Sequence, residues 1–510
     1  MTNDMKRGPA RVVLLLLLST VVGFISAFCV NDEHEWLTLA AGVAALALVL
    51  VPVAMEDRLD WFHPLMYFGA SLFLGTTFRS YFIIFGKSAG AAFLMHGRTP
   101  DVLLPGAGLV LLGSAGIFLG YLLNRMRTSP RSQPAEIENE VHGDDSVTWN
   151  QRRINALIIV AIIISVCATL YIMASTVGGL QSISIENISQ KRRIQIDSAT
   201  NASGAYAVMT YFTWLSEWEN YVFFASLIQV TGVKNRRVRD VVLCLIAGFV
   251  AFIPSFVSSA RTDMIVIAIG IVLILSWNVR LRASYVFGAA IVMLVVFVGM
   301  MILRRQAQNE STSFSSVGEV FDIAYSTHNY VDVVKHAFLI DATPTDLPYF
   351  YGKSYFAWLY APIPRSFWPD KPLLTDEIAV TRELFGGREH PTGIEFGGTP
   401  LGLFGESFRN FGFAGVFVVS FIYGALVWKF YRYFNCGRPV SNNGKLVYVA
   451  TFMWVGFGSA DIEFVRVITE IGMAVIPCAF IIWVASERRT SNDSAEKRRW
   501  NSRGGVGTPN

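Results

Sequence analysis

Apolar residues recur along this chain in long runs, separated by shorter polar stretches. A helix needs about 20 predominantly apolar residues to cross a hydrocarbon core of about 30 Å, and about twelve runs approach that length. They lie near residues 11–30, 36–54, 61–85, 102–123, 154–177, 205–230, 241–257, 263–279, 284–303, 412–434, 446–460 and 464–485. The pattern predicts an all-α integral membrane protein with about 12 transmembrane helices.

Two of these runs are interrupted by acidic residues. The sixth holds Glu217 and Glu219 near its middle, and the short eleventh ends at Asp461 and Glu463. Carboxylates at membrane depth are costly and tend to be functional. Either run could therefore be a re-entrant or broken helix. The two glutamates could serve as proton-relay groups, pair with an arginine, or simply be solvated.

Composition excludes several classes of protein. The chain has 510 residues, of which 53% are hydrophobic and 16% are charged, whereas soluble domains carry about 25% charged residues. This argues against soluble, collagen-like, disordered and disulfide-stapled chains. The net charge of +4 and the scattered basic residues do not indicate nucleic acid binding. The five cysteines have no close partners in the sequence, so neither a disulfide framework nor a zinc site is indicated.

The basic residues predict the orientation, because most Lys and Arg fall in every second loop. With the N-terminus inside, both ends are cytoplasmic and the first run is a retained signal anchor. The predicted divisions are helices 1–4 in residues 1–123, a cytoplasmic linker at 124–153, helices 5–9 in 154–303, a large extracytoplasmic loop at 304–411, helices 10–12 in 412–485 and a cytoplasmic tail at 486–510.

The outer loop carries three distinctive segments. Residues 352–356 read Gly-Lys-Ser-Tyr-Phe, and residues 363–372 read Ile-Pro-Arg-Ser-Phe-Trp-Pro-Asp-Lys-Pro. Residues 405–412 read Gly-Glu-Ser-Phe-Arg-Asn-Phe-Gly and lead directly into the tenth run. The pattern resembles that of the bacterial oligosaccharide repeat-unit polymerases, the Wzy-type O-antigen polymerases. The resemblance rests on residues 352–412 and on the predicted topology of the chain.

This resemblance implies a lipid-carrier glycosyltransferase with a GT-C-like fold, working at the outer face of the bacterial inner membrane. Its substrates would be glycans linked to undecaprenyl diphosphate, and its product a lipopolysaccharide or exopolysaccharide chain. The resemblance also implies a chain-length regulator and a flippase as partners. No cofactor or metal is expected, and the sequence contains no Rossmann-type glycine loop, Asp-x-Asp or His-x-x-x-His segment.

A diphosphate is best held by cations, and arginine in particular matches phosphate oxygens with two parallel hydrogen bonds. Arg261 is predicted to open the eighth helix at the outer face, where a helix N-terminus also favours anions. Alternatively, Ser258 or Thr262 caps that helix and Arg261 reaches towards the interface. Arg304, next to Arg305, lies outside against the charge bias, and could bind phosphate or anchor the helix end.

The proline-rich segment offers further candidates. Arg365 and Lys371 flank Trp368, whose ring could stack against a sugar, or the whole segment could rest on lipid headgroups. Arg382 lies eleven positions before Gly393, and this Arg-x₁₀-Gly spacing resembles one in the outer loops of some polymerases of this type. The alternative is a chance match, because Gly386 and Gly387 lie in the same window.

Two residues are candidate bases for the acceptor hydroxyl. Glu406 lies three positions before Arg409, so the two share a helix face if the tenth helix begins early, and they could also form only a salt bridge. His328 is the alternative, because imidazole titrates near neutral pH. Two other functions remain open on sequence grounds. One is an O-antigen ligase, and the other is a transporter or flippase of lipid-linked oligosaccharides.

Overall fold

We analysed a computed structural model of the chain. It describes residues 33–56, 60–85, 95, 98–127, 147–176, 204–233, 237–257, 261–278, 288, 331–361, 363, 367–368, 370–372, 380, 383–384, 400–435 and 441–488. The regular secondary structure in this part of the chain is helical apart from two three-residue strands. Seven of its helices are long and apolar enough to cross a membrane. The protein is therefore a multi-pass membrane protein.

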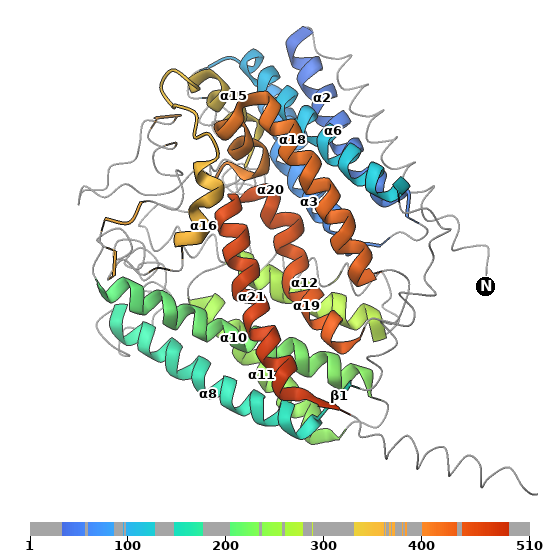
Figure 1. The fold of residues 1–510 in the computed structure, drawn as a ribbon, viewed down its shortest axis with the longest axis vertical. Helices are drawn as coiled ribbons and strands as arrows, with labels where there is room; N and C mark the ends of the chain where they lie inside the picture. The colour runs from blue at the N-terminus through green and yellow to red at the C-terminus, as the bar shows by residue number, and fades with distance from the viewer. Residues whose placement is uncertain are drawn as a thin grey trace, which may run out of the picture.

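One group of helices packs around α6 (Figure 1). It contains α2 (Glu33–Ala54), α3 (Pro64–Leu72), η1 (Phe73–Phe78), α4 (Arg79–Phe85), α6 (Leu103–Arg127) and α18 (Gly402–Asn435). Its core is a cluster of buried apolar side chains that includes Val49, Phe68, Val110 and Phe404. The segment η1 has π-helical hydrogen bonding, which locally widens the third predicted span.

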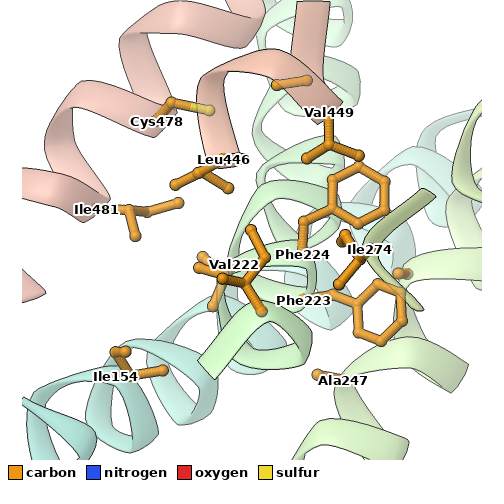
Figure 2. Close-up of a cluster of buried hydrophobic side chains, with 14 of the residues drawn as sticks. Ile154, Val222, Phe223, Phe224, Ala247, Ile274, Leu446, Val449, Cys478 and Ile481 are labelled. Atoms are coloured by element: carbon orange, nitrogen blue, oxygen red, sulfur yellow. The ribbon is translucent and has the colours of Figure 1, made fainter. Parts of the chain in front are cut away.

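A second group surrounds α10. It contains α8 (Gln151–Thr176), α10 (Gly204–Gly232), α11 (Val238–Val257), α12 (Arg261–Asn278), α19 (Asn442–Met453) and α21 (Phe464–Ala485). Figure 2 shows how Val222, Phe223 and Phe224 of α10 point towards side chains of the neighbouring helices. Most of these helices lack a strongly one-sided apolar pattern because they are apolar on almost every face, as expected for helices that contact both protein and lipid.

Glycine allows α6 and α18 to pack at close range. Gly113, Gly116 and Gly120 of α6 face α18, and Gly424 of α18 faces α6. A Cβ atom at Gly120 would overlap the carbonyl oxygen of Phe421, and one at Gly424 would overlap backbone atoms of α6. Small residues spaced four apart are a common way for membrane helices to bring their backbones together. The glycines thus fix the position of α18 within the bundle.

The structure modifies several expectations about the spans. The sixth span is the continuous helix α10, and not a re-entrant or broken segment. The eleventh does break, because α19 continues through the π-helical η7 (Trp454–Gly458) into α20 (Ser459–Asp461), and the helical path then stops at Ile462. The spans predicted near 11–30 and 284–303 lie outside the described residues.

The predicted cytoplasmic linker and tail are ordered where they meet. Strand β1 (Val147–Trp149) pairs antiparallel with β2 (Ser486–Arg488), and helix α8 begins at Gln151. The Trp149 indole nitrogen donates a hydrogen bond to Asn443 at a distance of 2.7 Å. This ladder joins the start of α8 to the end of α21, so these two helix ends lie at the same end of the bundle.

The tenth span starts at a backbone break. Helical hydrogen bonding runs through α18, but Phe411 and Gly412 have non-helical dihedral angles, with a φ of +65° at Gly412. Glycine adopts this left-handed conformation with little strain. The break coincides with residue 412, where the sequence predicts the span to begin. The short helical stretch from Gly402 to Asn410 before it carries the first six residues, 405–410, of the 405–412 segment.

Candidate functional site

Helix α15 (Val333–Ala342), from the first half of the predicted outer loop, is buried against the end of α6 at which that helix begins. Asp332 caps the helix by accepting a hydrogen bond from the Lys335 amide at 2.9 Å. A Cβ atom at Gly106 of α6 would overlap the backbone of α15. The loop therefore packs into this end of the bundle rather than only lying over it.

A buried ion pair joins this loop to the third span. The guanidinium of Arg79 lies 3.1 Å from the Asp332 carboxylate, and both side chains are fully buried. Asp461 at the end of α20 accepts a hydrogen bond from the Val331 amide at 2.9 Å. Burial raises the pKa of Asp461 above its usual range. The start of α15 is thus held by charged groups from two separate helices.

The sequence segments 352–356 and 405–412 pack directly against each other. The amides of Phe350 and Tyr351 donate to the carbonyl oxygens of Arg409 and Asn410 at 2.9 and 3.1 Å. The Gly352 amide donates to the Asn410 side-chain oxygen at 2.8 Å. Gly352 has a φ of +87°, which its lack of a side chain permits. We call residues 350–356 and 405–412 together the paired segment unit.

Glu406 lies at the centre of the paired segment unit. One carboxylate oxygen accepts a hydrogen bond from the Ser354 hydroxyl, and the other accepts one from the Phe464 amide at 2.6 Å. Phe464 is the first residue of α21. Glu406 therefore links the predicted outer loop, through Ser354, to α18 and to the start of α21, where a helix N-terminus favours negative charge. Both of its oxygens are engaged, an arrangement that suits a positioning group.

Neighbouring side chains complete the unit. The Asn410 amide nitrogen donates to the Ser354 hydroxyl at 2.8 Å, and the hydroxyls of Tyr355 and Ser407 lie 3.0 Å apart. The Arg409 guanidinium is buried and lies 4.3 Å from the centre of the Phe350 ring. Glu406 and Arg409 do lie in one helical stretch, but within the described residues Glu406 bonds to Ser354 and Phe464 rather than to Arg409.

In the proline-rich segment, Lys371 is mostly buried and donates to the carbonyl oxygens of Ala361 and Ile363 at 2.8 and 2.9 Å. It therefore closes this part of the loop on itself. Trp368 is exposed, and its ring lies edge-on to Tyr360 with 6.0 Å between ring centres. An exposed indole held by a second ring has the geometry of a stacking platform for a flat apolar face.

The side chains of the remaining candidate residues lie outside the described part of the chain. Arg261 begins α12, as predicted, but its side chain lies outside the described residues. His328, Arg304, Arg365 and Arg382 also lie outside them. The structure therefore brings Glu406 and Arg409 together and leaves the predicted cluster of outer arginines as a prediction.

The sequence analysis missed the charged group around Arg79, Asp332 and His336. His336 of α15 is buried, and its ring centre lies 6.5 Å from that of Phe404. Burial lowers the pKa of His336 to about 4, so the ring is neutral at physiological pH. The signal for Arg79 was its position inside an apolar span, where a charge is costly without a partner.

A scan against protein-family models, a search of curated proteins and a search of solved structures each found no match to this chain. The fold and the packing of residues 331–361 define the class as a multi-pass α-helical membrane protein with a polar, buried junction at one end of its helices.

Proposed function

We propose that the protein polymerises lipid-linked oligosaccharide repeat units at the outer face of the cytoplasmic membrane. It would transfer a growing glycan from undecaprenyl diphosphate onto a sugar hydroxyl of the next lipid-linked unit. The main support is the paired segment unit. Of the three segments that carry the resemblance to Wzy-type polymerases, 352–356 and 405–412 are hydrogen-bonded to each other, and 405–412 is also bonded to the start of α21.

The reaction sets clear chemical requirements. The bond between the anomeric carbon and the diphosphate oxygen breaks, a glycosidic bond forms, and the acceptor hydroxyl loses its proton to a base. The leaving diphosphate needs cations. In this proposal Arg261, Arg304 and Arg365 supply them, and Lys371 shapes the loop that carries Arg365. Trp368 offers a face for a sugar ring.

Glu406 takes a positioning role in this proposal because both of its oxygens already accept hydrogen bonds. It holds Ser354 and the start of α21 in place beside the acceptor. The base for the hydroxyl is then His328, or Glu406 itself after substrate displaces Ser354. General bases commonly reach their final geometry only in the substrate complex.

Two arginine variants test the proposal in cells. In a strain that lacks the chromosomal copy, Arg261→Ala or Arg365→Ala should abolish long polymer while single repeat units persist. Arg98→Ala is the matched control, since Arg98 is an exposed arginine paired with Asp341 beside α15, and it should support normal chain length. Full-length polymer in both test variants would contradict the assignment of these residues.

The same strain separates the polymerase from a ligase, because a polymerase deletion leaves lipid A–core carrying single repeats. A ligase deletion leaves lipid A–core without any repeat. A flippase would fail to turn over a lipid-linked repeat in a purified system, whereas a polymerase needs no other protein for the transfer step.

A further inference from the structure

A cavity of about 350 Å³ opens where α10 ends and α8 and α11 begin. This volume lies within the range of small-ligand sites, about 300–1,000 Å³. Its wall contains Val230 and Val233 together with the polar residues Asn150, Gln151, Arg152, Gln229, Arg237, Arg239 and Asp240. It lies at the opposite ends of these helices from those predicted to face outward, and therefore apart from the paired segment unit.

The charge of the cavity wall is positive. Its three arginines outnumber its single carboxylate, Asp240. Asp240 is already engaged, because it accepts a hydrogen bond from Asn155 at 2.8 Å and lies 3.7 Å from Arg239. Among the residues that the structure describes, Arg152 and Arg237 form no salt bridge. Two exposed guanidinium groups thus remain available to an anion, and guanidinium matches phosphate best.

The backbone adds to the positive electrostatic potential of the cavity. Asn150 caps α8 by accepting hydrogen bonds from the amides of Arg152 and Arg153 at 2.8 and 3.3 Å. Helix α11 begins at Val238, on the other side of the cavity. Both helices are long, and the N-terminal ends of both carry partial positive charge. The cavity therefore lies between two helix ends that favour a negative group.

An apolar stripe on α11 runs away from the cavity. Val238, Val242, Leu245 and Phe249 recur at helical spacing, and their exposed fractions are 79%, 46%, 69% and 73%. In a membrane-spanning helix such a stripe faces acyl chains. An amphiphile with its charged group in the cavity could lay its chains along this stripe. A water-borne phosphate would use the cavity and leave the stripe unused.

We propose that this cavity binds the phosphate group of an anionic phospholipid from the cytoplasmic leaflet. The distribution of Lys and Arg predicts that this end of the bundle is cytoplasmic, where basic pockets between helices meet anionic headgroups. The ligand chemistry is a phosphate ester, and the α11 stripe favours the lipid as its source. The assignment is independent of the proposed polymerase activity.

Lipid titration of the purified full-length protein tests this assignment. Native mass spectrometry would compare the binding of phosphatidylglycerol with that of phosphatidylcholine. Because each basic residue near an anionic surface contributes about a fivefold change in affinity, the double variant Arg152→Gln/Arg237→Gln should bind phosphatidylglycerol about 30-fold more weakly. Phosphatidylcholine binding should not change.

Two controls distinguish lipid binding in the cavity from general attraction to the positive surface of the protein. Arg127→Gln/Lys429→Gln removes two exposed cations at the ends of α6 and α18, and should retain wild-type binding. Val233→Trp keeps every arginine but fills the mouth of the cavity, since Val233 is an exposed wall residue, and should lose binding. Thermal unfolding in phosphatidylcholine checks that each variant is folded, and Val233→Trp provides the test if the arginine variant is not.

Three results would overturn the proposal. Equal losses in the test and control charge variants would show that only surface charge matters. Wild-type binding in Val233→Trp would show that the cavity is not the site. Calorimetry with inorganic phosphate provides the third arm: tight binding to protein in phosphatidylcholine, lost in Arg152→Gln/Arg237→Gln, would replace the lipid with a water-borne phosphate.

Discussion

Removing one charge from the Arg79–Asp332 pair should strongly destabilise the protein. The two groups lie 3.1 Å apart and are fully buried. Asp332→Asn keeps the side-chain oxygen that caps α15, but it leaves the Arg79 charge in the core without its anionic partner. Breaking a buried pair in this way costs about 3–5 kcal/mol.

A double-mutant cycle measures the interaction directly. Arg79→Gln should destabilise by a similar amount, about 3–5 kcal/mol, because it leaves Asp332 without its partner. Arg79→Gln/Asp332→Asn restores the balance with polar groups of similar size, so it should lose less stability than either single variant. Chemical unfolding of the purified protein in detergent, followed by tryptophan fluorescence, gives each free energy. A double variant whose loss equals the sum of the single losses would refute this reasoning.

Three further predictions follow from the packing, the buried His336 and the paired segment unit. Gly424→Ala forces α6 and α18 apart and should cost about 1–3 kcal/mol in thermal or chemical unfolding. Gly108→Ala on α6, where a Cβ meets nothing within 4 Å, should be neutral, and equal effects would contradict the close packing. Burial lowers the pKa of His336 to about 4, so the folded state keeps this ring neutral. The unfolded state binds protons first as the pH falls below about 6.5, and this ring should remove about 2 kcal/mol of stability by pH 5. His336→Leu should therefore lose about 2 kcal/mol less stability than the wild type between pH 7 and pH 5, and an unchanged pH dependence would contradict the burial of this ring. Glu406→Gln keeps one acceptor oxygen of two, so it should lower polymer formation in cells at least tenfold, about 1.4 kcal/mol in the barrier, whereas Glu487→Gln at the other end of the bundle should not.

The positions of the helices along the chain could be predicted because they depend on local hydropathy. The clearest case is the break at Gly412, where a Phe-Gly pair follows a polar helical turn and precedes a long apolar run. The continuity of α10 through Glu217 and Glu219 could not be predicted in the same way. It depends on neighbouring helices, which cover Glu219 completely.

Contacts between segments that are far apart in the sequence could not be predicted. Nothing local in residues 147–149 predicts a strand, since β1 exists only because β2 lies beside it at the end of α21. Likewise, Arg79 was visible as a charge within an apolar span, but its partner Asp332 comes from a distant loop. The segments that resemble a known family were found by their residues, and only the fold shows that Ser354 and Asn410, from two of these segments, bond to each other.

The most direct test of the proposed function is a turnover assay with the purified protein in lipid vesicles. Its substrate would be an undecaprenyl-diphosphate-linked repeat unit, and gel electrophoresis would separate the products by length. We predict a ladder of polymers with release of undecaprenyl diphosphate, weakened by Glu406→Gln and unchanged by Arg98→Ala. Substrate that stays as single repeats with the folded wild-type protein would contradict the assignment of this protein as a polymerase.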